Sequence, residues 1–90
     1  MIRRDDTSGR YELLDGDDVV GFAAFTHVDA DTISVPHTEV VPSRRGEGLG
    51  AQLVEGMLDD LARRGQRIVP LCPFVVEFIE KHPDYADLVA

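Results

Sequence analysis

A glycine-rich segment between an apolar run and an amphipathic run constrains the fold of this 90-residue chain more than any other feature. It extends from Val40 to Leu53 and reads V-V-P-S-R-R-G-E-G-L-G-A-Q-L. Its glycines, Gly46, Gly48 and Gly50, permit a tight turn and a close approach of the backbone to a ligand. A helix that starts directly after such a loop presents free N–H groups and partial positive charge to it. We therefore predict a strand, a loop and a helix in succession, with an anion site where the helix begins.

The residues before this loop predict an antiparallel meander of three strands. Residues 10–14, 19–28 and 32–41 are rich in apolar, β-branched and aromatic residues, and Asp-rich turn signals separate them. Pro36 interrupts the third segment and indicates an edge or a β-bulge. Residues 1–9 are polar, so we expect about this much of the chain to form a flexible end.

The residues after the loop predict a helix, a fourth strand and a second helix. Apolar side chains from Leu49 to Leu61 recur at spacings of three and four, and Gly65 is the expected C-terminal cap. Residues 67–72 read as a strand, which a right-handed crossover places parallel to the third strand. Pro70 indicates that these two strands splay apart at their C-terminal ends.

The last helix should begin at Pro73, with an apolar face formed by Phe74, Val75, Phe78 and Ile79. The predicted fold class is therefore α/β (α+β), with a mixed sheet ordered 1-2-3-4. The first three strands are antiparallel, and a β-loop-α-β crossover and a C-terminal helix follow. A chain of this length makes one domain, residues 1–90.

Composition limits the cellular setting and the partners. The formal charge of −8 argues against a general nucleic-acid binder and favours a cationic partner. Cys72 is the single cysteine, so there is no intrachain disulfide, in agreement with a reducing compartment. No apolar run approaches the roughly 18 residues of a membrane span, and the start of the chain lacks the apolar segment of a signal peptide. We expect a cytoplasmic protein with no membrane partner and no nucleic-acid partner.

Residues Arg45 to Gly50 fit the pattern Arg/Gln-x-x-Gly-x-Gly/Ala between a strand and a helix. This segment resembles the loop that holds the pyrophosphate of CoA in the GNAT superfamily of acyl-CoA-dependent N-acetyltransferases. A Rossmann loop or a P-loop fits less well, because there is no G-x-G-x-x-G in the first βα turn and no Gly-Lys-Ser/Thr. The alternative without a ligand is a plain strand-to-helix turn.

The chain also resembles a branch of small single-domain GNAT proteins, from Tyr11 onward. The matching segments are Pro36-His37-Thr38-Glu39-Val40, Pro70-Leu71-Cys72-Pro73-Phe74 and His82-Pro83-Asp84-Tyr85. Compared with larger GNAT proteins, it lacks the helices between the first two strands and the C-terminal strands, which commonly shape the acceptor site. The resemblance implies a minimal GNAT fold whose central parallel strands diverge to admit the pantetheine arm.

The resemblance further implies acetyl-CoA or coenzyme A as cofactor, with Val40 or a neighbour supplying the N–H that polarises the thioester. The predicted cofactor-binding residues lie at the end of the third strand, in the loop and on the last helix: Val40, Val41, Arg44, Arg45, Gly46, Glu47, Gly48, Leu49, Gly50, Ala51, Pro73, Phe74 and Phe78.

Three residues are the main candidates for catalysis, and a fourth is a candidate proton donor. His37 is a candidate base, since imidazole titrates near neutrality, and Glu39 competes with it on the same face of the strand. Cys72 would lie at a helix N-terminus, which lowers a thiol pKa, but it could equally be a small buried hydrophobe. Tyr85 is a candidate to protonate the leaving thiolate. With no Cys/His pair at ligand spacing, no metal site is predicted.

Three functions remain open at this stage. The first is acetyl-CoA-dependent N-acetyl transfer to an amine, either a small amine or a Lys-rich peptide. The second is a CoA-binding or acyl-CoA-binding module with little turnover, and the third is an interaction protein whose loop binds nothing. The protein should be a monomer or a weak homodimer.

Overall fold

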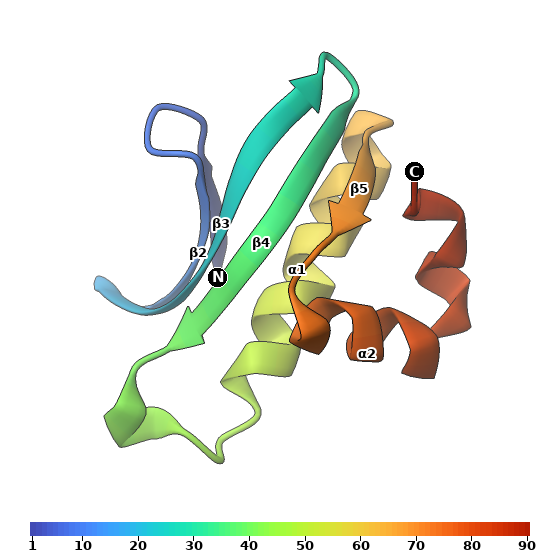
Figure 1. Cartoon of the computed structure of the whole chain (residues 1–90). Helices are drawn as coiled ribbons and strands as arrows, with labels where there is room; N and C mark the ends of the chain where they lie inside the picture. Colours follow the sequence, from blue (N-terminus) through green and yellow to red (C-terminus); the bar gives the residue numbers. More distant parts are fainter.

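A five-stranded sheet with two helices on one of its faces forms the protein (Figure 1). The computed structural model describes all residues from 1 to 90. The strands follow chain order across the sheet, and the first four are antiparallel to their neighbours while the last is parallel. The elements are β1 (Ile2–Asp5), β2 (Arg10–Asp15), β3 (Asp18–Asp29), β4 (Thr32–Val40), a 3₁₀ turn (Pro42–Arg44), α1 (Leu49–Arg64), β5 (Arg67–Pro70), α2 (Pro73–Lys81) and a second 3₁₀ segment (Pro83–Leu88).

The predicted meander, crossover and C-terminal helix are confirmed, and the sheet has one strand more than predicted. Ile2–Asp5, expected within a flexible end, pairs with β2 as an antiparallel edge strand. Its polar sequence gave no strand signal, and the strand is held instead by contacts with distant residues. Ile2 packs over Gly56 of α1, where any larger residue would collide with it.

Helix α1 covers the middle of the sheet. Its buried residues are the predicted stripe: Leu49, Leu53, Val54, Met57, Leu58 and Leu61. Gly65 ends the helix in the left-handed conformation, with φ of 68°, as predicted. The stripe joins side chains from β2, β3, β4, β5 and α2 in one core cluster of 18 buried residues, so the helix and the sheet are held by a continuous apolar layer.

The bulge predicted at Pro36 is present in β4. Ala24 pairs with His37 and Thr26 with Ser34, so Val35 and Pro36 together face the single residue Phe25. Parallel pairing with β5 ends at the same place, at Val35 opposite Pro70. Beyond it, β4 continues to Val40 paired with β3 but not with β5, while the chain after β5 turns into α2. We call this opening between β4 and the start of α2 the split.

The C-terminal tail returns to the sheet beside β5. Val89 forms a parallel bridge with Ile68, and the Ala90 N–H donates to the Ile68 carbonyl at 2.9 Å. No helix is both long enough and apolar enough to cross a membrane.

Candidate active site

The loop between β4 and α1 holds a run of backbone N–H groups that have no acceptor within the protein. The Gln52 N–H donates to the Gly48 carbonyl at 3.2 Å, which is the first hydrogen bond of α1. From Gly46 through Ala51, no backbone N–H donates to a protein group. The first turn of α1 also carries no acidic residue. A run of free N–H groups at the positive end of a helix is a site for an anion.

The glycines of the loop have different roles. Gly46 and Gly48 have φ of 93° and 76°, and a side chain on either would point into open space. These two positions favour glycine because of their backbone conformation. Gly50 instead lies against an aromatic ring: a Cβ there would come within 3.0 Å of Phe74. Its small size lets α2 approach α1.

The two loop arginines are in different states. Arg44 forms ion pairs with Glu47 at 2.8 Å and with Asp15 at 2.6 Å. These hydrogen bonds raise the pKa of Arg44 above its usual range, and Arg44 lowers the pKa of Glu47. Arg45 is exposed and has no ion pair. Arg44 therefore neutralises the acidic residue of the loop, whereas Arg45 is free to bind an anion.

A surface hollow of about 390 Å³ lies over the free N–H groups. We call it the loop hollow, and its lining contains nine of the predicted cofactor-binding residues: Val40, Arg44, Arg45, Gly46, Gly48, Leu49, Gly50, Ala51 and Phe74. Leu49 is 8% exposed and belongs to the core, so its backbone is the part available to a ligand.

Four predicted cofactor residues lie outside the loop hollow. Val41 lines a hollow on the face of the sheet opposite α1, and Glu47 is paired with Arg44. Phe78 is buried and lines a groove of about 290 Å³ between α1 and α2. Pro73 is the first residue of α2, as predicted, and lines none of these hollows. Phe74, expected on the buried face of α2, is 43% exposed.

The split exposes backbone groups of β4. The Val41 N–H donates to Val20 on β3 at 2.9 Å. Because successive residues of a strand point their N–H groups to opposite sides, the N–H groups of Thr38 and Val40 face away from β3 and into the split. A hollow of about 210 Å³, which we call the slot, lies there and is lined by Thr38, Glu39, Val40, Gly50, Leu53 and Phe74.

Cys72 lies at the end of the split, at the N-cap position of α2. Its sulfur is 3.4 Å from the Thr38 hydroxyl, and the residue is 8% exposed. Burial raises the pKa of the Cys72 thiol, but the Thr38 hydroxyl and the N–H groups of Val75 and Phe74 outweigh it, so the pKa is lowered overall. Cys72 is therefore nearly buried, and its hydrogen-bond donors favour the thiolate form of its side chain.

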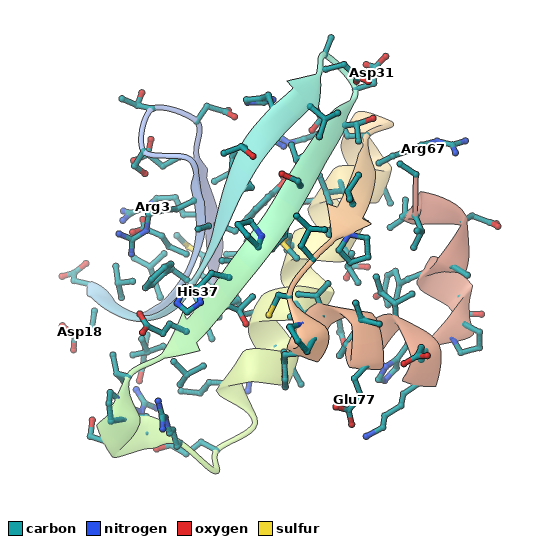
Figure 2. All side chains as sticks on the ribbon, in the orientation of Figure 1. Arg3, Asp18, Asp31, His37, Arg67 and Glu77 are labelled. Atoms are coloured by element: carbon teal, nitrogen blue, oxygen red, sulfur yellow. The ribbon has the colours of Figure 1, made fainter.

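His37 and Glu39 lie on the other face of β4, exposed, with the imidazole Nε2 3.7 Å from the carboxylate. In Figure 2, His37 projects from β4 on the side facing the viewer, whereas α1 lies behind the sheet. Thr38, between them in sequence, points to the opposite face and contacts Cys72. The three predicted catalytic residues thus do not form one cluster, because the strand separates Cys72 from the other two.

Two further residues differ from the sequence-based expectation. The Tyr85 hydroxyl donates to Asp59 of α1 at 2.8 Å, and this bond raises its pKa to about 12, so the group has a partner outside the split and is a weak acid. Thr38 was not predicted as a site residue. The alternation of side chains along β4 could have indicated it, because it places Thr38 on the face opposite His37 and Glu39. No group of three or more His, Cys, Asp or Glu side chains is arranged to hold a metal ion.

Comparisons with known proteins agree on the fold. A GCN5-like protein from Staphylococcus aureus, solved by NMR, superposes with a TM-score of 0.73 over 100% of this chain and 87% of that one, at 21% identity. The ribosomal-protein-S18-alanine N-acetyltransferase from Escherichia coli superposes with a TM-score of 0.67 at 20% identity, and the match covers 88% of this chain and 54% of that one. No curated protein matches the sequence significantly.

The sequence itself carries the family assignment. The family model described as GCN5-related N-acetyl-transferase matches residues 10–88, which include the loop, the split and both helices. The chain therefore belongs to the GCN5-related N-acetyltransferase family.

Proposed function

We propose that this protein transfers an acetyl group from acetyl-CoA to a primary amine. The observation that carries this proposal is the run of free N–H groups from Gly46 through Ala51 at the positive end of α1. A pyrophosphate requires several convergent donors, and backbone N–H groups at a helix N-terminus provide them. Arg45 adds an unpaired guanidinium beside the same hollow.

The slot suits the part of acetyl-CoA that extends from the pyrophosphate to the thioester. The slot in the split adjoins the loop hollow through Val40, Gly50 and Phe74, which line both. Its lining includes the apolar residues Val40, Leu53 and Phe74, which suits a pantetheine arm. Val40 is the residue where the loop hollow, the slot and the opposite face of the sheet meet.

Each residue of the site then has a distinct chemical task. Acetyl-CoA supplies an acetyl thioester that an uncharged amine can attack. With acetyl-CoA bound, the Val40 N–H, which faces the split, would donate to the carbonyl oxygen and stabilise the negative charge that develops there. As the C–N bond forms, the C–S bond would break and release CoA as the thiolate. Cys72, in contact with the Thr38 hydroxyl, lies nearly buried at the end of the split, at the N-cap of α2. Glu39 and His37 lie on the other face of β4, where one of them can take the proton of the incoming ammonium group.

The cofactor part is tested by calorimetric titration with acetyl-CoA. Arg45→Ala should weaken binding about tenfold or more, because a charge-assisted contact contributes roughly 1.5–3 kcal/mol. Arg64→Ala is the control: it removes the same charge from the far end of α1, where Arg64 pairs with Asp60. Equal losses in the two variants would mean that the general electrostatic field, and no specific contact, attracts the cofactor.

A second candidate is a CoA-binding module with little turnover. It is favoured by the face of the sheet opposite α1, where His37 and Glu39 are exposed and no helix covers them. Acetyl transfer to a panel of amines, measured by release of free CoA thiol, separates the two candidates. Binding of acetyl-CoA without turnover of any amine would favour the module.

A further inference from the structure

The face of the sheet opposite α1 carries a hollow of about 370 Å³ near the end of β4, which we call the sheet-face hollow. Its lining includes Arg10 of β2, Phe22 of β3, Glu39 of β4 and Arg45 of the loop. Glu39 also lines the slot, and it is the one acidic residue that lines both. The hollow therefore adjoins the place where the thioester is expected.

Cross-strand register explains why these residues meet. Glu12, Phe22 and Glu39 are paired in one row across β2, β3 and β4, and Arg10, Ala24 and His37 form the next row. Paired residues point to the same face of a sheet. Neighbouring strands lie about 4.8 Å apart, so the backbones of β2 and β4 are roughly 10 Å apart. A small molecule can span this distance between Arg10 on one side and Glu39 on the other.

The Arg10 guanidinium packs on the Phe22 ring, but not all of its N–H groups have an acceptor. Its guanidinium carbon lies 4.0 Å from the centroid of the Phe22 ring, and its Nε is buried without an acceptor. Its ion pair with Glu12 is long, at 3.5 Å, whereas Arg3 binds the same carboxylate at 2.6 Å. Arg3 and Arg10 therefore share the single negative charge of Glu12, and Arg3 has the shorter contact. Arg10 retains positive charge and unused donors, and its side chain is 35% exposed.

We infer that the sheet-face hollow is the acceptor site and that the acceptor is a primary amine carrying an anionic group, such as a carboxylate. Glu39 binds the ammonium end beside the split, and Arg10 binds the anion with the exposed end of its guanidinium. Phe22 lies between them under the carbon chain. This inference rests on the proposed function and names the substrate class for the same site. It disfavours a Lys-rich peptide, whose positive charges would meet Arg10.

The test compares two acceptors with the same carbon chain and amine, of which only one carries a negative charge at the other end. 6-Aminohexanoate and 6-aminohexanamide carry the same distant amine, but the second has an uncharged amide in place of the carboxylate. We expect kcat/KM for the carboxylate to exceed that for the amide about tenfold or more, because the uncharged amide cannot form a charge-assisted hydrogen bond with the Arg10 guanidinium. Arg10→Gln should bring this ratio close to one while affinity for acetyl-CoA stays unchanged.

Arg67→Gln is the matched control. Arg67 is an exposed arginine on β5 that does not line the hollow and does not contact Glu12, so its loss removes the same charge and the ratio should be retained. Equal rates for both acceptors in the wild-type protein, or an unchanged ratio in Arg10→Gln, would overturn the inference.

A binding experiment keeps the inference testable if neither compound is acetylated. NMR titration of the CoA-saturated protein should show shifts at the Arg10 Nε–H and at the Phe22 and Ala24 amides with the carboxylate, and much smaller shifts with the amide. Identical shifts, or none, would overturn the acceptor assignment. A protein that fails to bind acetyl-CoA at all would instead contradict the proposed function.

Discussion

Successive residues of β4 serve two different surfaces. Thr38 and Val40 direct their N–H groups into the split, where Thr38 also contacts Cys72. His37 and Glu39 face the opposite side of the sheet, where the acceptor is proposed to bind. A substitution at His37 or Glu39 should therefore affect amine binding and proton transfer more than cofactor affinity.

The reactivity of Cys72 is a prediction at this residue scale. Because its pKa is lowered in the fold, alkylation by iodoacetamide should reach half its maximal rate at a lower pH in the native protein than in the denatured one. Acetyl-CoA should slow the reaction, since Cys72 lies in the split. The measurement is the alkylation rate over pH by mass spectrometry, with and without acetyl-CoA. A thiol that reacts only after unfolding would show that Cys72 serves packing alone.

At the scale of elements, features encoded within one helix or turn agree with the prediction, whereas features that depend on contacts between distant residues were not predicted. The stripe and Gly65 cap of α1 follow from helical periodicity and turn chemistry, which are encoded within the element itself. Strand β1 could not be read from I-R-R-D, because its place depends on pairing with β2 and on the Ile2–Gly56 contact. Phe74 has the right spacing for the buried face of α2, yet it turns toward Gly50 and the hollows.

The contact between β1 and α1 gives a prediction that runs against helix propensity. Alanine is favoured over glycine inside a helix by about 1 kcal/mol, so Gly56→Ala would stabilise an isolated α1. In the protein, the added methyl group collides with Ile2, and we expect a net loss of stability. Hydrogen exchange should show reduced protection at Leu14, whose N–H donates to the Met1 carbonyl at 2.8 Å.

A double-mutant cycle identifies the cause of that loss. Ile2→Ala makes room for the new methyl group, so Gly56→Ala should cost less in that background than in the wild-type chain. Urea denaturation measures the four free energies of unfolding. Additive effects would show that the strand and the helix are not coupled through these two residues.

For the whole molecule, the two faces of the sheet differ in character, and the acceptor is proposed to bind on the face without helices. The helices and the apolar core occupy one face, and the other carries ion pairs and the sheet-face hollow. The free N–H groups between β4 and α1 could be predicted because the loop and the first turn of α1 are contiguous in sequence. The sheet-face hollow could not, because Arg10, Phe22 and Glu39 come from three strands and meet only through the register.

A polar network joins residues that are distant in sequence at one end of the sheet. The Tyr11 hydroxyl of β2 donates to Asp60 of α1 at 2.8 Å and accepts from Arg4 of β1 at 3.0 Å. Arg4 also binds the Gln66 side chain, which in turn donates to the Ala30 carbonyl in the β3–β4 turn. The network therefore connects β1, β2 and α1 with the β3–β4 turn and with Gln66, which lies between α1 and β5.

This network predicts how stability changes at alkaline pH. Burial and the bond to Asp60 raise the pKa of Tyr11 from 10.0 to about 12. A raised pKa means that the folded state favours the protonated phenol, so this stabilisation is complete below about pH 10 and is lost as the pH rises toward 12. Two pKa units correspond to about 2 to 3 kcal/mol. The free energy of unfolding, measured by urea denaturation, should fall over this range by about that amount more in the wild-type protein than in Tyr11→Phe.

Two variants complete the test of that prediction. Tyr11→Phe should be less stable than wild type at pH 7, because Asp60 and Arg4 lose a partner inside the protein. Tyr85→Phe is the comparison: its hydroxyl also has a pKa of about 12, but it lies near the surface on Asp59, so its removal should change the alkaline slope less. If Tyr11→Phe lost stability above pH 10 as steeply as wild type, the alkaline transition would have to arise from other groups, and the network would not depend on the phenol proton.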